Sequence, residues 1–389
     1  MRRLVLLTSA ILFVETIFFA ALAPLLPGFE EELGLSKSQA GLLVAMYALG
    51  GIAGAIPGAL VASRVGIKPA TVAGLLLVTA GCVAFGVVDS YWLLNATRFA
   101  QGFGSSFCWT GALAWLISAT PRRRRGEMIG IAMGSAIGGA LLGPLLGGLA
   151  SEVGRAPAFG GVAALSLLLA AWALELPAPP QGESQPLRLL LVALRSRRVL
   201  VGMWLLMLPA LLFGTLGVLA PLQLHELGWS TLGIAATFFV SAGIEASLSP
   251  AIGRWSDRRG RLAPIRFGLI AAGAVSLIIP WLDDRWVLSL LVVLAGISYG
   301  MFWTPATALL SEGWESVGVE HALGFGLMNF AWAPGHVIGS AAGGGLADLG
   351  GDITAYAVVA AVCLTTFAAL GQRSLSAAAQ VQPSATEPG

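Results

Sequence analysis

The sequence predicts an all-α membrane protein in which twelve transmembrane helices form two parallel six-helix bundles. Three observations predict it: an apolar composition, twelve long apolar stretches, and matches between the two halves at one offset. Of the 389 residues, 57% are hydrophobic and 11% are charged, against about 25% charged in ordinary soluble domains. So few charges cannot form a polar surface. A soluble enzyme, a nucleic-acid-binding protein and a disordered protein are therefore excluded.

Each predicted span has about 20 residues, enough to cross a hydrocarbon core of about 30 Å. The first six are 4–27, 39–62, 69–88, 92–118, 128–150 and 157–176. The second six are 199–222, 231–252, 264–282, 286–311, 322–346 and 353–371. The first stretch contains Ala21-Leu22-Ala23, as a signal peptide could. We favour a span, because the stretch is long, Pro24 lies where cleavage would fall, and eleven further spans follow.

The basic residues indicate that both termini are cytoplasmic. With the N-terminus inside, all but four of the 22 Lys and Arg residues lie on the inner side. The exceptions are Lys37, Arg155 and Arg285 in outer loops and Arg98 within a span. Cytoplasmic loops carry the excess of Lys and Arg, which supports this orientation. One inner loop, 312–321, departs from the rule because it has three acids and no Lys or Arg.

Short motifs recur between the two halves. Four matches share an offset of 194 residues: Glu32–Ser36 with Glu226–Ser230, Arg64–Gly66 with Arg258–Gly260, Gly102 with Gly296, and Trp109-Thr110 with Trp303-Thr304. Four matches at one offset indicate two homologous halves. Because each half has an even number of helices, the copies face the same way, as in transporters with parallel repeats.

The repeat divides the chain into an N-terminal bundle at 1–176, a cytoplasmic linker at 177–198, a C-terminal bundle at 199–372 and a short polar cytoplasmic tail at 373–389. Pro177–Gly182 is rich in helix-breaking residues. Leu187–Arg198 mixes leucines with four arginines. It is either a solvated linker or, as we favour, a short interfacial helix on the inner leaflet.

The loop Gly253-Arg254-Trp255-Ser256-Asp257-Arg258-Arg259-Gly260-Arg261 matches the pattern G-x-x-x-D-R-x-G-R. This resembles the signature of the major facilitator superfamily, and the resemblance covers essentially the whole chain. It implies a tight glycine turn whose carboxylate and arginines pair at the inner gate. The implied gate residues are Arg64, Gly66, Gly253, Asp257, Arg258, Gly260 and Arg261. The equivalent loop in the first half departs from the pattern, because Ser63 replaces the usual aspartate.

Two further motifs resemble the family. Arg98-Phe99-Ala100-Gln101-Gly102 looks like its R-x-x-Q-G motif, which implies a part in proton coupling for Arg98. An arginine at the outer interface is the alternative. Gly139–Gly148 resembles the antiporter branch's G-x-x-x-G-P-x-x-G-G motif, which implies export. Its residues are Gly139, Gly143, Pro144, Gly147 and Gly148. Three of these glycines share one face and permit close packing, and the proline bends the helix.

Glu15 is the single most informative residue. It lies about 16 Å into the first span, near the midplane. An isolated carboxylate there costs at least about 2–3 kcal/mol, so it must be protonated, paired or hydrated. An acid nine residues before Pro24 resembles vesicular amine transporters and bacterial multidrug–proton antiporters. We expect Glu15 to exchange a proton for substrate. A structural pair, for example with Arg98, is the alternative.

Glu245 is a second acid within a span, and Gly51 occupies the equivalent position in the first half. It is either a second protonation or gating site, or it pairs with an arginine of the inner loop. Polar and aromatic residues at mid-depth are candidates for the substrate cavity: Tyr47, Gln101, Trp109, Trp303, Asn329, Trp332 and His336. Together with Glu15, such aromatic rings suit a cationic substrate.

The resemblance implies a proton-coupled efflux antiporter of the plasma (inner) membrane for small amphipathic or cationic organic molecules, working by alternating access. The alternative is a proton symporter or uniporter for a sugar, amino acid or organic anion. A sensor or a membrane-embedded enzyme would need an added domain or a catalytic constellation, and neither is visible. We expect a monomer in membrane lipid, with a small-molecule substrate and protons as partners, no nucleic acid, and no cofactor or metal beyond the proton gradient.

Overall fold

The computed structural model describes all residues except 1, 122–123, 179–187, 320 and 380–389, and the described residues form helices without strands. The first helices are α1 (Arg2–Ala20), η1 (Ala23–Leu25), α2 (Leu26–Leu33), α3 (Lys37–Arg64), α4 (Ile67–Val87), α5 (Tyr91–Ala119), α6 (Arg125–Val153) and α7 (Arg155–Glu175). After them come α8 (Arg188–Ala193), α9 (Arg197–Glu226), α10 (Thr231–Arg259), α11 (Leu262–Ile278), η3 (Ile279–Trp281), α12 (Arg285–Gly300), α13 (Trp303–Glu315) and α14 (His321–Ala379). The predicted all-α membrane class is confirmed.

The predicted spans all coincide with helical segments. Within the described residues, ten helical stretches are long and apolar enough to cross a membrane. One of them, Gly326–Gly371, contains two passes, because α14 has non-helical backbone angles at Gly350 and Gly351. The 29-residue α5 is not among the ten, and it carries the buried polar residues Asn95, Arg98 and Gln101.

Some helix bounds differ from the prediction. The first span is not one straight helix, because α1 ends at Ala20 and the 3₁₀ turn η1 contains Pro24. A proline lacks the amide donor that a continuing helix needs. The predicted interfacial helix 187–198 is shorter, since α8 ends at Ala193 and α9 begins at Arg197. Most of the preceding linker (179–187) lies outside the described residues. The last helix continues to Ala379, beyond its predicted end at 371.

Glycines allow the closest helix contacts. A Cβ atom added at Gly139 or Gly143 of α6 would overlap α1, and one at Gly147 would overlap Ala21, which directly follows α1. One added at Gly335 or Gly339 of α14 would overlap α9 in the same way. Small residues let two backbones approach closely in a membrane, where no hydrophobic force drives the helices together. The α1–α6 and α9–α14 pairs are therefore close glycine-dependent contacts near the candidate site, as is α3–α5, where a Cβ atom at Gly102 would overlap the Tyr47 carbonyl.

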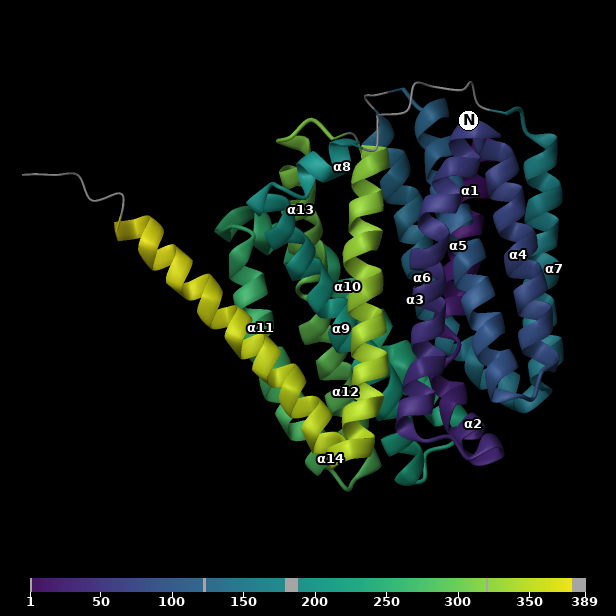
Figure 1. Cartoon of the computed structure of the whole chain (residues 1–389). Helices are drawn as coiled ribbons and strands as arrows, with labels where there is room; N and C mark the ends of the chain where they lie inside the picture. Colours follow the sequence, from purple (N-terminus) through teal and green to yellow (C-terminus); the bar gives the residue numbers. More distant parts are fainter. Residues whose placement is uncertain (1, 122–123, 179–187, 320, 380–389) are drawn as a thin grey trace, which may run out of the picture.

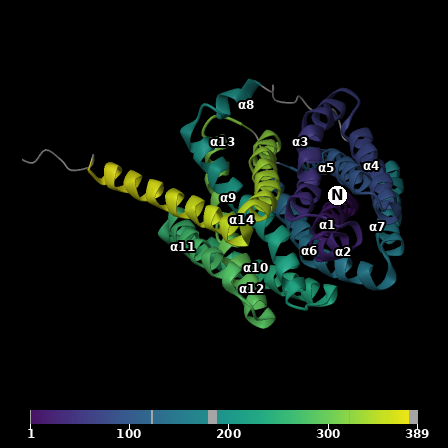
Figure 2. The same cartoon turned by 60° about the horizontal axis from the view of Figure 1, so that its bottom comes forward.

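The helices of residues 2–175 group on one side of the molecule and those from α8 onward on the other (Figures 1 and 2). The sides meet mainly through α3 with α14 and α6 with α10. One end of the molecule carries α2 and the first turn of α3, and we call it the α2 end. The opposite end carries the N-terminus, α8 and α13 (Figure 1).

Candidate functional site

Glu15 lies in the interior of the protein. Its residue is 1% exposed, and it faces α3 and α5 rather than the glycine face of α6. The Tyr47 hydroxyl lies 3.4 Å from Glu15 Oε2 and 2.8 Å from Ser105 Oγ. The Cys108 thiol lies beside the same carboxyl group. Within the described chain, Glu15 Oε1 has no hydrogen-bond partner. A proton or a bound cation would satisfy that oxygen.

Arg98 lies close to Glu15 but does not pair with it. The residue is 1% exposed, so it faces the interior and not the outer interface. Its guanidinium carbon lies 4.9 Å from the centre of the Tyr47 ring and 5.3 Å from that of Phe18. In the described structure no ion pair within 4.0 Å joins Arg98 to Glu15. Tyr47 therefore connects the two groups, its ring under Arg98 and its hydroxyl toward Glu15.

Gln101 orients Arg98. Arg98 Nη1 donates to Gln101 Oε1 at 3.4 Å, and Gln101 Nε2 donates to the Gly81 carbonyl at 2.7 Å. Arg98 Nη2 also donates weakly to the Phe19 carbonyl, at 3.5 Å. Arg98 Nε has no hydrogen-bond partner among the described residues. The arginine is thus held largely by aromatic faces, with spare donor capacity.

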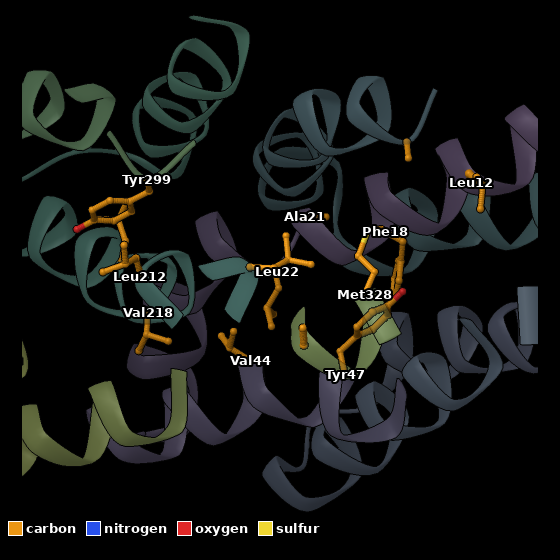
Figure 3. Close-up of a cluster of buried hydrophobic side chains, with 14 of the residues drawn as sticks. Leu12, Phe18, Ala21, Leu22, Val44, Tyr47, Leu212, Val218, Tyr299 and Met328 are labelled. Atoms are coloured by element: carbon orange, nitrogen blue, oxygen red, sulfur yellow. The ribbon is translucent and has the colours of Figure 1, made fainter. Parts of the chain in front are cut away.

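An aromatic cluster joins the two sides of the molecule next to Glu15. The Phe19 ring of α1 lies 5.0 Å from Tyr47, 5.4 Å from Trp332 and 5.1 Å from His336, measured between ring centres. Trp332 and His336 of α14 stack at 5.3 Å, with 10° between their planes. Figure 3 shows Phe18 and Tyr47 within the buried apolar cluster that surrounds this region. Three predicted residues, Tyr47, Trp332 and His336, therefore meet at Phe19, and the Tyr47 hydroxyl links them to Glu15.

Within the described residues, three other predicted cavity residues make no contact with this cluster that the structure records. Trp109 and Trp303 are partly buried and pack against the apolar core. Asn329 is exposed on α14. None of the three has a ring contact or a side-chain hydrogen bond to Glu15, Arg98 or Tyr47 among the described residues. The described structure therefore gives no direct contact between these three residues and Glu15.

Glu245 has different surroundings. It is half-buried on α10, and its carboxyl group lies against Gly300 at the end of α12. A Cβ atom added at Gly300 would lie 2.6 Å from the carboxyl carbon of Glu245. In the described part of the chain, no hydrogen bond or ion pair to this carboxyl group occurs. The predicted alternative, a pair with Arg254 or Arg258, is absent.

The signature loop pairs within its own side of the molecule. Asp257 accepts a hydrogen bond from Arg261, and Arg261 also pairs with Glu312 of α13 at 3.0 Å. Partial burial lowers the pKa of Arg261, but the two carboxylates outweigh this effect and raise the pKa above its usual value. Gly260 has φ +86°, a conformation that favours glycine. Glu312 also gives a reason for the acidic loop that broke the charge rule, since it neutralises an arginine of the neighbouring loop.

The first-half loop has no comparable ion pair. Gly66 has φ +126° and marks the same kind of turn. Arg64 is exposed, and no ion pair within 4.0 Å involves it in the described ranges. Lys68 instead donates to the Leu174 and Leu176 carbonyls at 2.6 and 2.8 Å, which caps the end of α7. The missing ion pair agrees with the sequence, in which Ser63 stands at the position where the motif has an aspartate.

A polar network closes the α2 end. Lys37 of α3 pairs with Asp352 at 2.8 Å and lies 3.7 Å from Glu226. The backbone amides of Lys37 and Ser38 both donate to Asp348 at 3.0 Å, so an acid of α14 caps α3. His225 meets Glu31 at 2.8 Å. These bonds all cross between the two sides of the molecule.

Sequence reasoning missed several residues around these groups. Phe19 lies four residues after Glu15, so the two share a helix face, which is a usable signal. Ser105 and Cys108 gave no signal, because small polar residues are common in packed helices. Asp348 and Asp352 also form an i, i+4 acidic pair, and Lys37 is one of only three outer basic residues in the predicted topology.

Comparison with known proteins agrees with this architecture. The Major Facilitator Superfamily model matches residues 8–319. The uncharacterized MFS-type transporter YcaD of Escherichia coli O139:H28 is 25% identical over 269 residues, which cover 68% of this chain and 69% of that protein. The solved nucleoside transporter NupG has a TM-score of 0.75 at 14% identity, covering 95% of this chain and 98% of that one. A D-xylose-proton symporter has a TM-score of 0.72 at 16% identity, covering 94% and 95%.

The two structural neighbours establish a shared fold and nothing about substrate, because their identities are low. The family model, in contrast, covers most of the chain, and its match includes the helices that carry Glu15, Arg98 and Glu245. This chain is a multi-pass membrane protein and belongs to the Major Facilitator Superfamily of transporters.

Proposed function

We propose that this protein is a proton-coupled antiporter that exports small cationic or amphipathic organic molecules across the plasma (inner) membrane. The observation that carries the proposal is the carboxyl group of Glu15, which is buried and keeps one oxygen without a partner in the described structure. A single carboxylate can hold a proton or a cationic substrate, but not both at once. Exchange at one group therefore couples the two movements in opposite directions.

The aromatic cluster supports a cationic substrate. The Tyr47 hydroxyl lies beside Glu15, the Tyr47 ring packs against Phe19, and Phe19 packs against Trp332, so rings from α3, α1 and α14 form one cluster. Aromatic faces attract desolvated cations, by about 2 kcal/mol or more per contact. Arg98 already stacks on Tyr47, so its charge acts on both proton and substrate at Glu15.

The closed α2 end supports alternating access. We assign this end to the outside, with both termini cytoplasmic, from the distribution of basic residues. The bundles at 1–176 and 199–372 would then rock about the site, and the network at Lys37, Asp348 and Asp352 would break when the outer side opens. Asp257 and Arg261, with Arg64 and Arg258, would help to close the inner side in that state.

Proton symport of an anionic or neutral molecule is the second candidate, and Arg98 is the observation that favours it. Its buried Nε has no partner in the described region, so the arginine could donate to a substrate carboxylate or hydroxyl. Both candidates use Glu15 for the proton. In an antiporter, substrate and proton cross the membrane in opposite directions. In a symporter they cross in the same direction.

The direction of proton movement distinguishes the candidates. Everted vesicles that contain the protein are left without an energy source, and ethidium, a lipophilic cation, is added outside. An antiporter moves ethidium inward and protons outward, so the lumen becomes alkaline, as a pH-sensitive dye inside the vesicles reports. We expect alkalinisation with the wild type and none with Glu15→Gln.

The same assay includes xylose and a small carboxylate as alternative probes. Acidification of the lumen by either probe would establish symport and overturn the antiport proposal. Transport without any pH change would indicate a uniporter and would overturn it as well. Vesicles without the protein correct for passive entry of the dye.

A further inference from the structure

A groove lies on the surface of the protein, away from the Glu15 site. It runs between the first turns of α9 and the last part of α14, and its volume is about 480 Å³. The residues that matter here are Arg197, Leu200, Trp204, Thr366, Ala369 and Leu370. Because α9 begins at Arg197, the groove opens at the end of a membrane-spanning helix.

The groove is charged at one end and apolar along its length. Arg197, Leu200 and Trp204 lie on one face of α9, at spacings of three and four residues. At 1.5 Å per residue, Trp204 lies about 10 Å from Arg197 along the helix axis. Leu200 is 48% exposed and Trp204 is 41% exposed, although both lie within a span. Trp204 Nε1 donates to Thr366 Oγ1 at 3.2 Å, which ties the two walls together.

A second arginine, Arg266, contacts the backbone of one wall of the groove. Arg266 of α11 donates through Nη2 to the Leu370 carbonyl at 2.9 Å, and Leu370 lines the groove. Arg266 Nε is buried and has no hydrogen-bond partner among the described residues. Neither Arg197 nor Arg266 takes part in an ion pair within 4.0 Å in the described chain. Arg197 thus lines the groove, and Arg266 is bonded to the backbone of a lining residue. Each brings a guanidinium group, without an anionic partner among the described residues, to Leu370 or the groove beside it.

We propose that this groove binds an anionic phospholipid, with the headgroup phosphate held by Arg197 and Arg266 and one acyl chain lying along Leu200, Trp204 and Ala369. Charge complementarity favours this occupant, since the arginines lack carboxylate partners and guanidinium groups pair well with phosphate. The surroundings favour it too. The apolar walls lie at bilayer depth and the charges at the helix end, which matches the order of tail and headgroup in one leaflet.

The test measures lipid binding to the purified full chain in a neutral detergent. Native mass spectrometry counts phosphatidylglycerol and phosphatidylcholine retained at equal concentrations, and thermal unfolding is followed with each lipid. We expect one phosphatidylglycerol to be retained preferentially and to raise Tm more than phosphatidylcholine does. Arg197→Gln and Arg266→Gln should each weaken its binding about five-fold. Arg3→Gln, which removes an exposed arginine outside the groove, is the control and should leave binding unchanged.

A second variant tests the acyl-chain part independently of the arginines. Ala369→Trp fills the apolar part of the groove and should also abolish preferential retention, whereas glycerol phosphate, the headgroup alone, should not compete. Equal retention of both lipids by the wild type would overturn the proposal. So would full retention by Ala369→Trp or by the arginine variants. Displacement by glycerol phosphate would indicate a site for free phosphate instead of a lipid.

Discussion

Glu15 in α1 and Glu245 in α10 are both acids within membrane-spanning helices, yet their surroundings differ. Glu15 is 1% exposed and lies beside Tyr47, Ser105 and Cys108. Glu245 is half-buried, its carboxyl group lies beside Gly300, and no hydrogen bond or ion pair reaches that group in the described structure. Depth in a span is therefore not enough to assign a role. The groups that surround the carboxyl decide what it can bind and what it can move.

The repeat shows which residues of the first half correspond to Glu245 and its neighbour Gly300. At the offset of 194 residues, Glu245 corresponds to Gly51 and Gly300 corresponds to Ser106. In the first half, Ser106 Oγ donates to the Gly51 carbonyl at 2.5 Å. In the second half, the larger side chain and the glycine have exchanged helices. Glu245 thus occupies a contact between helices that both halves of the chain have, whereas Glu15 belongs to a site that reaches α14 through Phe19.

Glu15→Gln tests the comparison with the largest expected effect. Proton-driven transport should fall to the level of vesicles without protein, because glutamine cannot take up or release the proton. Substrate counterflow, which needs no net proton movement, should remain. Glu245→Gln is the matched control and should change the rate by about two-fold at most, since it loses no hydrogen bond in the described structure. Equal losses in the two variants would contradict the distinction between the acids.

Arg98→Lys should lower proton-driven transport by about ten-fold. A planar guanidinium group stacks on aromatic faces, and a lysine ammonium group cannot reproduce contacts to Tyr47, Phe18 and Phe85 together. Initial rates at several substrate concentrations measure the effect, with counterflow as the check on folding. A wild-type rate would show that Arg98 acts only through its charge.

Tyr47→Phe should lower the rate by about five-fold, because one net hydrogen bond contributes about 1 kcal/mol. The variant keeps the ring under Arg98 and removes only the hydroxyl beside Glu15 and Ser105. Tyr91→Phe is the control, since its hydroxyl donates to the Gln39 carbonyl at 3.3 Å in an exposed region. If both variants behave alike, the Tyr47 hydroxyl has no specific part in the site.

Gly300→Ala addresses Glu245 and should act on stability rather than coupling. The new methyl group overlaps the Glu245 carboxyl, and such overpacking costs about 1–3 kcal/mol. Glu245→Ala should relieve most of this cost, which a double-mutant cycle of unfolding free energies in mixed micelles measures. Additive effects of the two substitutions would show that the acid moves away without strain.

The sequence predicted the helices well and the site in part. Apolar length located every span, and Pro24 explained a break that length alone did not indicate. Of the candidate residues, Glu15, Arg98, Tyr47, Gln101, Trp332 and His336 gather together. Trp109, Trp303 and Asn329 have no ring contact or side-chain hydrogen bond to this group in the described structure, and their place in the cavity stays a prediction.

The sequence by itself determined that lipid is the solvent, where the helices cross it, and which few charges lie inside. These properties are local, since they depend on the length and composition of single segments. Only the tertiary structure decided which of those charges meet. Phe19 reaches Trp332, and Lys37 reaches Asp352, from opposite halves of the chain. Such contacts depend on how each helix is rotated and packed against its neighbours, which the order of residues along one helix does not specify.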